Sequence, residues 1–549
     1  MTASASVSWN VPPAWTVVPH RTIIELLLDA AAKRPNAPAL IFEEGLAIST
    51  TQLLDLAERF AGYLRERIQP GDCVAIMLPN RAEFMVAWLA VVACRGILVS
   101  INPAARDHDA GHILRDSRSV LAIVGAETRE LAERVRGDCP RLREIVVVDG
   151  PEPRGLDGYV STNGRFPFVA AQCQRDDIAN IYYTSGTTGA PKGCMLDHAY
   201  WLRVVDVDLR LHPKGPEDRQ LCCLQFFYND PAWQLLAALA TGAAVVVMRR
   251  FSVSRFWNVV RTYGVTEILS IASIPILLLK ALPDPRDRDH AVKRALQVAV
   301  PASLHREMNE RWGFPWIDGY GITEGGFITR VPLAAADELA GSGSIGIPCP
   351  EVELRLVDDD GRDVAPGETG EFLVRAPAMM RGYVNRPEES AEAIDADGWL
   401  HTGDLGRADE RGFLYFVGRK KDIIRRGGEN VAAAEVEAVL RSHPKVLEVA
   451  VIPVPDALRG EEIKAYVLPV AGETPETIPP RELVAYCLER LAPHKVPRYF
   501  EYRATDFPRT PSMRVRKEAL RQERNDLTAG AWDREAELGH LSSRDGRLR

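Results

Sequence analysis

Residues 182–193 read Tyr-Tyr-Thr-Ser-Gly-Thr-Thr-Gly-Ala-Pro-Lys-Gly, a stretch that combines glycines, hydroxyl side chains and a lysine. Glycines let the backbone turn sharply, so that consecutive N–H groups can surround an anion. Hydroxyls add hydrogen-bond donors, and the lysine adds a point charge. The stretch therefore predicts a loop that binds a polyphosphate. The residues expected to contact phosphate are Thr184, Ser185, Gly186, Thr187, Thr188, Gly189 and Lys192.

This loop differs from a Walker A loop, which ends in Gly-Lys followed by Ser or Thr. Here Pro191 precedes the lysine and Gly193 follows it. An ordinary surface turn rich in glycine and threonine is the competing interpretation. Such turns rarely concentrate hydroxyls, glycines and a lysine at one place, so the sequence favours phosphate binding.

The composition is that of a large soluble protein. A chain of 549 residues with 46% apolar and 26% charged residues predicts two or more domains. The net charge of −8 and the lack of Lys/Arg runs argue against a nucleic-acid partner. Residues 1–16 lack signal-peptide character, and the apolar runs are too short to span a bilayer. Nine scattered cysteines, an odd number, fit a reducing cytoplasm.

Strand and helix patterns alternate along most of the chain. Residues 51–68 have helical periodicity, residues 73–78 form an apolar strand pattern, and residues 243–271 repeat the alternation. This order predicts mainly parallel sheets covered by helices on both faces. From residue 343 short strand patterns with turns indicate a small β-rich subdomain, and a mixed unit of about 100 residues follows residue 418.

Four further motifs follow the phosphate loop in the sequence. They are Gly-Tyr-Gly-Ile-Thr-Glu at 319–324, Trp-Leu-His-Thr-Gly-Asp at 399–404, Gly-Arg-Lys-Lys-Asp at 418–422 and Arg-Gly-Gly-Glu-Asn at 426–430. With the loop, they resemble the motifs of the adenylate-forming superfamily, which includes acyl-CoA synthetases, adenylation domains of peptide synthetases, and luciferases. The resemblance runs from about residue 50 to residue 520 and is nearest to carnitine/crotonobetaine-type acid–CoA ligases.

The resemblance implies an α/β fold with a large N-terminal domain of stacked αβ subdomains, a small β-rich subdomain and a small mobile α+β C-terminal domain. The expected boundaries are 1–418 for the N-terminal domain, which binds ATP and the acid, 419–525 for the mobile domain, and 526–549 for a polar tail. Lys421 stands at the hinge position, where a few residues can absorb the backbone change of a rotating domain.

The same resemblance implies a site for ATP and Mg²⁺. The phosphate loop would hold the β- and γ-phosphates, with Lys192 and Thr323 as catalytic contacts and Glu324 as the ligand of Mg²⁺. Tyr320 and Gly321 would contact adenine, and Asp404 and Arg419 would hold ribose or phosphate. A core position for Tyr320 and a turn position for Asp404 are the structural alternatives.

Two positions depart from the family pattern. Arg514 stands where the family has a lysine that reaches the adenylation site, and Tyr228 replaces a histidine found in many acyl-CoA ligases. Arginine keeps the charge, but it is a planar fork rather than a point charge. Asn229, Asp230 and Trp233 follow Tyr228 and are expected to line the substrate pocket with it, although the polar ones could instead cap the next helix.

The leading hypothesis is an AMP-forming ligase that activates a small carboxylic acid as acyl-AMP, releases pyrophosphate and passes the acyl group to CoA. An alternative keeps the fold and changes the chemistry, because some relatives in secondary metabolism are ATP-dependent diazotases that adenylate nitrite and diazotise an aryl amine without CoA. A stand-alone amino-acid adenylation domain usually has Asp after the phenylalanine at position 227, where this chain has Tyr228. A non-catalytic nucleotide-binding relative is opposed by Lys192, Glu324 and Asp404. Neither the substrate nor the oligomeric state follows from the sequence.

Overall fold

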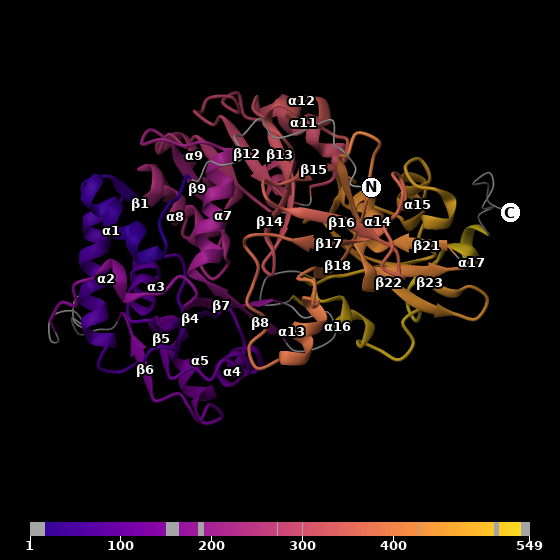
Figure 1. The fold of residues 1–549 in the computed structure, drawn as a ribbon. Coiled ribbons are helices and arrows are strands. Elements are labelled where there is room, and N and C mark those ends of the chain that lie inside the picture. The colour runs from indigo at the N-terminus through magenta and orange to yellow at the C-terminus, as the bar shows by residue number, and fades with distance from the viewer. Residues whose placement is uncertain are drawn as a thin grey trace.

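A computed structural model describes residues 17–149, 164–184, 191–271, 273–298, 300–427, 429–509 and 515–539. Figure 1 shows helices α1 to α5 at one end of the molecule and the elements that follow α13 at the other. The fold is α/β, with a large N-terminal part and a smaller C-terminal part, as the sequence predicts.

The first sheet lies near the N-terminal end and carries the phosphate loop. Its strand order within the described residues is β6-β5-β3-β4-β7-β8, and only β8 runs antiparallel to its neighbour. The strands are β3 (Cys73–Met77), β4 (Ile97–Ser100), β5 (Leu121–Val124), β6 (Glu144–Val147), β7 (Ile178–Thr184) and β8 (Lys192–Asp197). The neighbouring helices are α2 (Thr50–Leu64), α3 (Ala82–Ala93), α4 (Asp107–Asp116) and α5 (Ala126–Arg136).

Helix α2 begins at a capping box formed by Ser49 and Gln52. The Ser49 hydroxyl accepts from the Gln52 N–H, and the Gln52 side chain accepts from the Ser49 N–H, which completes a capping box. Leu53, Ala57, Phe60 and Leu64 are buried on one face of α2, as the predicted periodicity requires.

The second sheet continues from parallel strands into the β-rich subdomain. Its order is β16-β17-β18-β19-β15-β14-β13-β12-β11-β9-β10-β1-β2 in the described part of the chain. The strands of the parallel block and its edge are β1 (Pro38–Phe42), β2 (Ala47–Ser49), β9 (Arg219–Cys222), β10 (Ala244–Val247), β11 (Glu267–Leu269), β12 (Arg294–Gln297) and β13 (Trp316–Ile322). The antiparallel strands are β14 (Gly326–Arg330), β15 (Ser344–Pro348), β16 (Glu353–Val357), β17 (Gly370–Arg375), β18 (Leu400–Ala408) and β19 (Leu414–Arg419). The helices are α1 (Ile23–Lys33), α7 (His198–Leu211), α8 (Asp230–Thr241), α9 (Val253–Thr262), α10 (Ser273–Lys280), α11 (Ala302–Trp312), α12 (Ala336–Leu339) and α13 (Pro387–Ala393).

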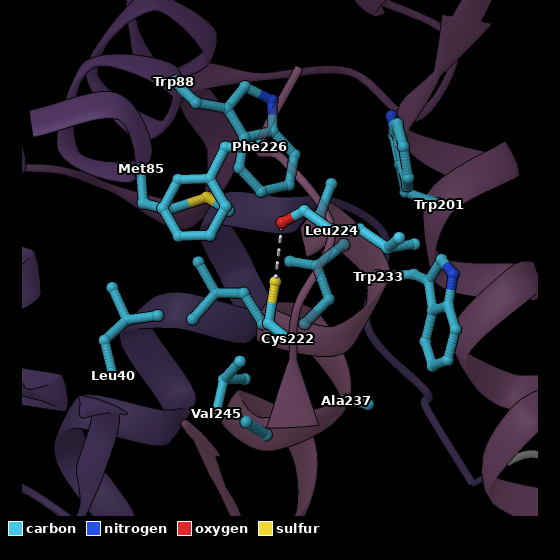
Figure 2. Close-up of a cluster of buried hydrophobic side chains, with 14 of the residues drawn as sticks. Leu40, Met85, Trp88, Trp201, Cys222, Leu224, Phe226, Trp233, Ala237 and Val245 are labelled. Atoms are coloured by element: carbon cyan, nitrogen blue, oxygen red, sulfur yellow. Dashed lines mark hydrogen bonds between the residues drawn. The ribbon is translucent and has the colours of Figure 1, made fainter. Parts of the chain in front are cut away.

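One apolar core joins the two sheets. Figure 2 shows Met85 and Trp88 of α3 in the same apolar cluster as Cys222 of β9. The cluster also includes Val74 of the first sheet and Val245 of the second, so side chains of both sheets belong to one core. The Trp88 and Trp201 rings meet edge to face with centroids 5.9 Å apart. Cys222 and Cys223 are buried thiols, and all nine cysteines are free.

The C-terminal part has its own sheet and core. The strand order is β21-β20-β23-β24-β25 within the described residues, and β22 also pairs with β23. The strands are β20 (Ile423–Arg426), β21 (Glu429–Ala432), β22 (Val446–Asp456), β23 (Gly460–Pro469), β24 (Tyr499–Tyr502) and β25 (Trp532–Asp533). The helices are α14 (Ala433–Arg441), α15 (Pro480–Leu488), α16 (Lys517–Arg521) and α17 (Arg534–Leu538).

The structure differs from the sequence analysis after residue 526. The segment expected as a polar tail contains β25, which pairs with β24, and the short helix α17. Arg534 is fully buried there, and its Nε donates to the carbonyl of Pro497 at 3.2 Å. Its Nη2 lies 3.6 Å from the Glu535 carboxylate, so the buried charge has a counter-ion, which composition alone does not reveal.

Candidate active site

The phosphate loop connects the two strands of a hairpin. Thr184, the last residue of β7, pairs directly with Lys192, the first residue of β8. Ser185, Gly186, Thr187, Thr188 and Gly189 lie outside the described residues, so their expected contacts with phosphate stay predictions. The His112 side chain lies 2.9 Å from the Pro191 carbonyl, a contact that fixes the end of the loop.

Glu324 lies across from this hairpin. It stands with Thr323 in the turn between β13 and β14, and its Oε1 accepts from the Thr184 hydroxyl at 3.3 Å. The Tyr383 hydroxyl donates to the same oxygen at 3.2 Å. Burial, and then the Glu324 charge, raise the pKa of Tyr383, so the phenol stays a donor at neutral pH.

Tyr383 also connects Glu324 to Lys192. The Lys192 ammonium lies 5.1 Å from the Tyr383 ring centre and forms an ion pair with Glu389 of α13. The segment around Tyr383 runs antiparallel to β8, with Tyr383 opposite Cys194 and the Val384 N–H donating to the Gly193 carbonyl at 2.8 Å. Sequence analysis missed Tyr383 and Glu389, because neither belongs to a motif or a periodic segment.

The motifs predicted to bind adenine and ribose meet at Tyr320, on strand β13 of the same hairpin. The Tyr320 hydroxyl donates to Asp404 Oδ2 at 2.7 Å, and Arg419 Nε lies 3.1 Å from Asp404 Oδ1. Strands β18 and β19 set this geometry, because Asp404 pairs directly with Arg419. Burial, followed by Asp404, raises the pKa of Tyr320. Three residues predicted from separate motifs therefore lie in contact, while their roles toward the nucleotide stay predictions.

Gly321 is required by the tight packing of the hairpin. A Cβ at this position would lie 2.6 Å from the Gly326 carbonyl oxygen, so a larger residue would force the two strands apart. The glycine therefore fixes the spacing between Tyr320 on β13 and Glu324 in the turn.

The residues predicted to line the substrate pocket stand at the start of α8. Asn229 is the N-cap residue, but its side chain makes no capping hydrogen bond. The Phe227 and Tyr228 rings have centroids 4.4 Å apart, and Asp230 opens the helix beside them. Trp233 is buried and meets the Phe327 ring edge to face at 5.2 Å. The helix start therefore faces the β13–β14 hairpin through Trp233.

Lys421 lies between the two parts of the chain. It belongs to a short 3₁₀ turn, Lys420–Asp422, between the end of β19 and the start of β20. Partial desolvation, followed by nearby cations, lowers the pKa of Lys421 to about 8 despite the opposing charge of Asp422. Arg514 lies outside the described residues, so its expected reach into the site stays a prediction.

The site offers few protein ligands for a metal. Among the described residues there is no cluster of three or more His, Cys, Asp or Glu side chains arranged to hold an ion. Mg²⁺ in nucleotide sites is bound by phosphate oxygens and one or two carboxylates, so the single carboxylate of Glu324 fits such an ion. In the described ranges, every helix is too short or too polar to cross a bilayer.

Comparison with known proteins identifies the family. The family of AMP-binding enzymes matches residues 27–384, and the C-terminal domain of AMP-binding enzymes matches residues 435–514. The chain belongs to the AMP-binding enzymes. It is 31% identical over 524 residues to a crotonobetaine/carnitine–CoA ligase of Citrobacter koseri, an alignment that covers 92% of this chain and 100% of the relative. This confirms the predicted resemblance to adenylate-forming acid–CoA ligases.

Solved structures of AMP-binding enzymes have the same fold. The o-succinylbenzoate CoA synthetase of Bacillus subtilis, in complex with an acyl-adenylate intermediate, is 30% identical with a TM-score of 0.79, and the match covers 90% of this chain and 97% of that one. The anthranilate CoA ligase AuaEII, in complex with anthranoyl-AMP, is 26% identical with a TM-score of 0.82, covering 96% and 100%. The predicted fold class is therefore confirmed.

Proposed function

We propose that this AMP-binding enzyme uses ATP to convert a carboxylic acid to an acyl-adenylate, releases pyrophosphate, and transfers the acyl group to CoA. The observation that supports this most directly is the arrangement around the β13–β14 hairpin. Thr184 contacts Glu324 in the hairpin turn, and Tyr383 connects Glu324 to Lys192. Tyr320 of β13 contacts Asp404, which pairs with Arg419. A nucleotide bound between these two groups of residues would have its phosphates at one end and its ribose at the other.

Electrostatics would supply most of the rate in this reaction. The acid and the triphosphate are both anions, so attack of the carboxylate oxygen on the α-phosphorus needs charge neutralisation and in-line positioning. Lys192 would neutralise the leaving pyrophosphate, and the Thr184 hydroxyl would orient it. Mg²⁺, held by Glu324 when bound, would add positive charge beside the phosphates.

The nucleotide products test this proposal. With ATP, Mg²⁺ and a panel of carboxylic acids, we expect AMP and pyrophosphate in equal amounts, and a mass shift to acyl-CoA only when CoA is present. ADP as the main nucleotide product would contradict adenylation. An acyl-adenylate that accumulates unchanged in the presence of CoA would contradict CoA as the acceptor.

A basic hollow near the acceptor segment supports CoA as the acceptor. It has a volume of about 660 Å³ and is lined by Gln225, three residues before Tyr228, and by Arg249, Arg250 and Arg255. Arg255 forms an ion pair with Glu43 at 2.8 Å, whereas Arg249 and Arg250 are exposed. Arginine binds phosphate through two parallel hydrogen bonds, and CoA carries phosphates remote from its thiol.

Reversing two of these arginine charges should slow transfer of the acyl group to CoA and leave formation of the acyl-adenylate unchanged. We expect Arg249→Glu combined with Arg250→Glu to raise the KM for CoA about tenfold, because two phosphate contacts become repulsive. The rate of acid-dependent ATP–pyrophosphate exchange should stay within about twofold of the original. Arg129→Glu, an exposed change on α5, is the matched control. An unchanged KM for CoA would show that the hollow does not bind CoA.

The diazotase alternative is tested by the same assays. Tyr228 and Asn229 at the start of α8, and Arg514 in place of lysine, are its motivation, since an altered acceptor region suits a different nucleophile. Nitrite with an aryl amine would then promote AMP formation and yield a diazonium product without CoA. Consumption of ATP only with carboxylic acids would eliminate this alternative.

We also propose that the C-terminal part, predicted as residues 419–525 and extended here by β25 and α17, moves as a domain about Lys421 between the two half-reactions. The position of Lys421 between β19 and β20 supports this, because only a short 3₁₀ turn links the two sheets at that point. A few residues at the end of an element are enough to absorb such a rotation. The rotation would bring Arg514 to the carboxylate and the α-phosphate during adenylation only.

A further inference from the structure

Arg330, the last residue of β14, is a buried cation without a counter-ion. It is 4% exposed, and among the described residues no carboxylate lies within 4.0 Å of its guanidinium. Its fully buried Nη1 has no hydrogen-bond partner there either. Arg210, which is buried to a similar degree, instead pairs with Glu351 at 2.7 Å and with Asp206 at 3.8 Å. The isolation of Arg330 is therefore not the rule for buried arginines in this protein.

An isolated guanidinium in a protein interior is unfavourable. Arginine stays protonated at all physiological pH values, so it cannot escape burial by losing its charge. A buried charge without a partner destabilises a fold strongly, whereas a paired and hydrogen-bonded one is tolerated. A bound anion from outside the chain would reduce this cost.

Asp318, on the strand beside Arg330, does not form an ion pair with it. Asp318 lies on the adjoining strand, but its side chain is 3.4 Å from Nδ1 of His305 and is not within ion-pair distance of the guanidinium. Burial raises the pKa of Asp318 to about 7, although Gln297 and Arg330 both oppose the rise. This carboxyl group is therefore only partly ionised at neutral pH, and it acts on the arginine from beyond ion-pair distance.

Arg330 lies on the side of β14 that faces Trp233 of the predicted substrate pocket. Its guanidinium lies over the Phe327 ring, 4.9 Å from the ring centre, and Phe327 contacts Trp233 at 5.2 Å. The guanidinium also fills the space above Gly319, where a Cβ would lie 2.7 Å from Nη1. Gly319 directly precedes Tyr320, so Arg330 stands behind the nucleotide motif on the Trp233 side.

The register of β13 and β14 gives the approximate distance between Arg330 and the expected adenylation centre. Arg330 pairs with Gly319, and Phe327 pairs with Gly321, the glycine beside the expected adenylation centre. Two residues of strand correspond to roughly 7 Å. A molecule whose reacting carboxylate lies at Gly321 could therefore place a second group at Arg330 across a chain of a few carbon atoms.

We propose that Arg330 binds a second carboxylate, so that the preferred substrate is a dicarboxylic acid. The inference rests on the proposed function. A guanidinium matches a carboxylate with two parallel hydrogen bonds, and the bound anion would compensate the buried charge. An acid that carries a quaternary ammonium group, as carnitine does, would instead bring a second cation to this position.

The test compares acids of equal length and different terminal charge. Succinate, glutarate and adipate are assayed against butyrate, pentanoate, hexanoate and 4-trimethylammoniobutanoate in ATP–pyrophosphate exchange and in thermal unfolding. We expect kcat/KM for the best diacid to exceed that of its matched monoacid at least tenfold, and Arg330→Met to remove this preference. Arg330→Lys should retain part of it, because the charge remains without the fork.

Thermal unfolding separates recognition from a structural role. Arg330→Met removes an unpaired buried charge, so its Tm without ligand should equal or exceed that of the original protein, and diacids should no longer raise it. Arg210→Met, which breaks an existing ion pair, should lower Tm and keep the diacid preference. If Arg330→Met does not fold, Arg330→Lys and Arg330→Gln provide the comparison.

These measurements separate failure of the Arg330 proposal from failure of the proposed adenylation. Monoacids that react as well as diacids, or a diacid preference that survives Arg330→Met, would overturn the role of Arg330 and leave adenylation intact. If no acid supports exchange, adenylation itself fails. A rise in Tm with diacids that depends on Arg330 would still support the carboxylate site in that case, and its absence would overturn it.

Discussion

Asp404→Ala should lower kcat/KM for ATP by about 100-fold or more, the largest effect of a single change that we expect in this protein. The carboxylate accepts from the Tyr320 hydroxyl at 2.7 Å and lies 3.1 Å from Arg419 Nε, and it is almost fully buried. Its removal would cost the predicted ribose contacts and leave a phenol and a guanidinium without their acceptor.

Two control variants isolate the cause of that loss. Asp404→Asn keeps an acceptor for Tyr320, so it should fold normally and lose mainly the interaction with Arg419. Asp409→Ala removes another tyrosine–aspartate hydrogen bond, from Tyr415 at 3.1 Å, away from the predicted nucleotide site. Steady-state kinetics at varied ATP, together with Tm, measure all three variants. A normal KM for ATP in Asp404→Ala would show that another residue holds the ribose.

Glu324→Gln should reduce turnover at least tenfold, and about 100-fold at limiting Mg²⁺. Glutamine keeps an oxygen that can accept from Thr184 and Tyr383, so the turn should hold its shape while the charge disappears. The loss should therefore be specific to the metal, with a higher Mg²⁺ concentration needed for half-maximal rate.

Tyr383→Phe provides the complementary control. It removes one hydrogen bond to Glu324 and leaves the carboxylate charged, so we expect turnover to fall less than in Glu324→Gln, by roughly tenfold at most. The Mg²⁺ dependence should stay near that of the original enzyme. If Glu324→Gln has normal turnover at limiting Mg²⁺, a different carboxylate holds the ion.

Local sequence patterns were sufficient to predict most of the fold. The apolar face at residues 51–68 corresponds to α2, and the run at residues 73–78 corresponds to β3, because helical and strand periods depend only on neighbouring residues. The ends of these elements shifted by a few residues, as expected where terminal hydrogen bonds compete with turns. Residues 532–538 were missed, since β25 and α17 are too short to show any period.

The candidate site was predictable only where motifs mark it. Tyr320, Asp404 and Arg419 come from three motifs, and the structure brings them into contact. Tyr383 acquires its position from pairing with β8, which no local pattern reveals. Arg330 looks like an ordinary charged residue at the end of a strand, and only the absence of a nearby carboxylate in the described residues makes it unusual.

The pairing of residues 381–384 with β8 has a consequence during synthesis. β8 is the outermost strand of its sheet, and Cys194 meets Tyr383 across about 190 residues of intervening chain. At ordinary translation rates the unpaired side of β8 stays open for roughly 10 to 40 s before its partner leaves the ribosome. Open strand edges invite association with other chains. A recombinant fragment of the N-terminal part should therefore extend through α13, since one that stops before residue 381 would carry that open edge permanently.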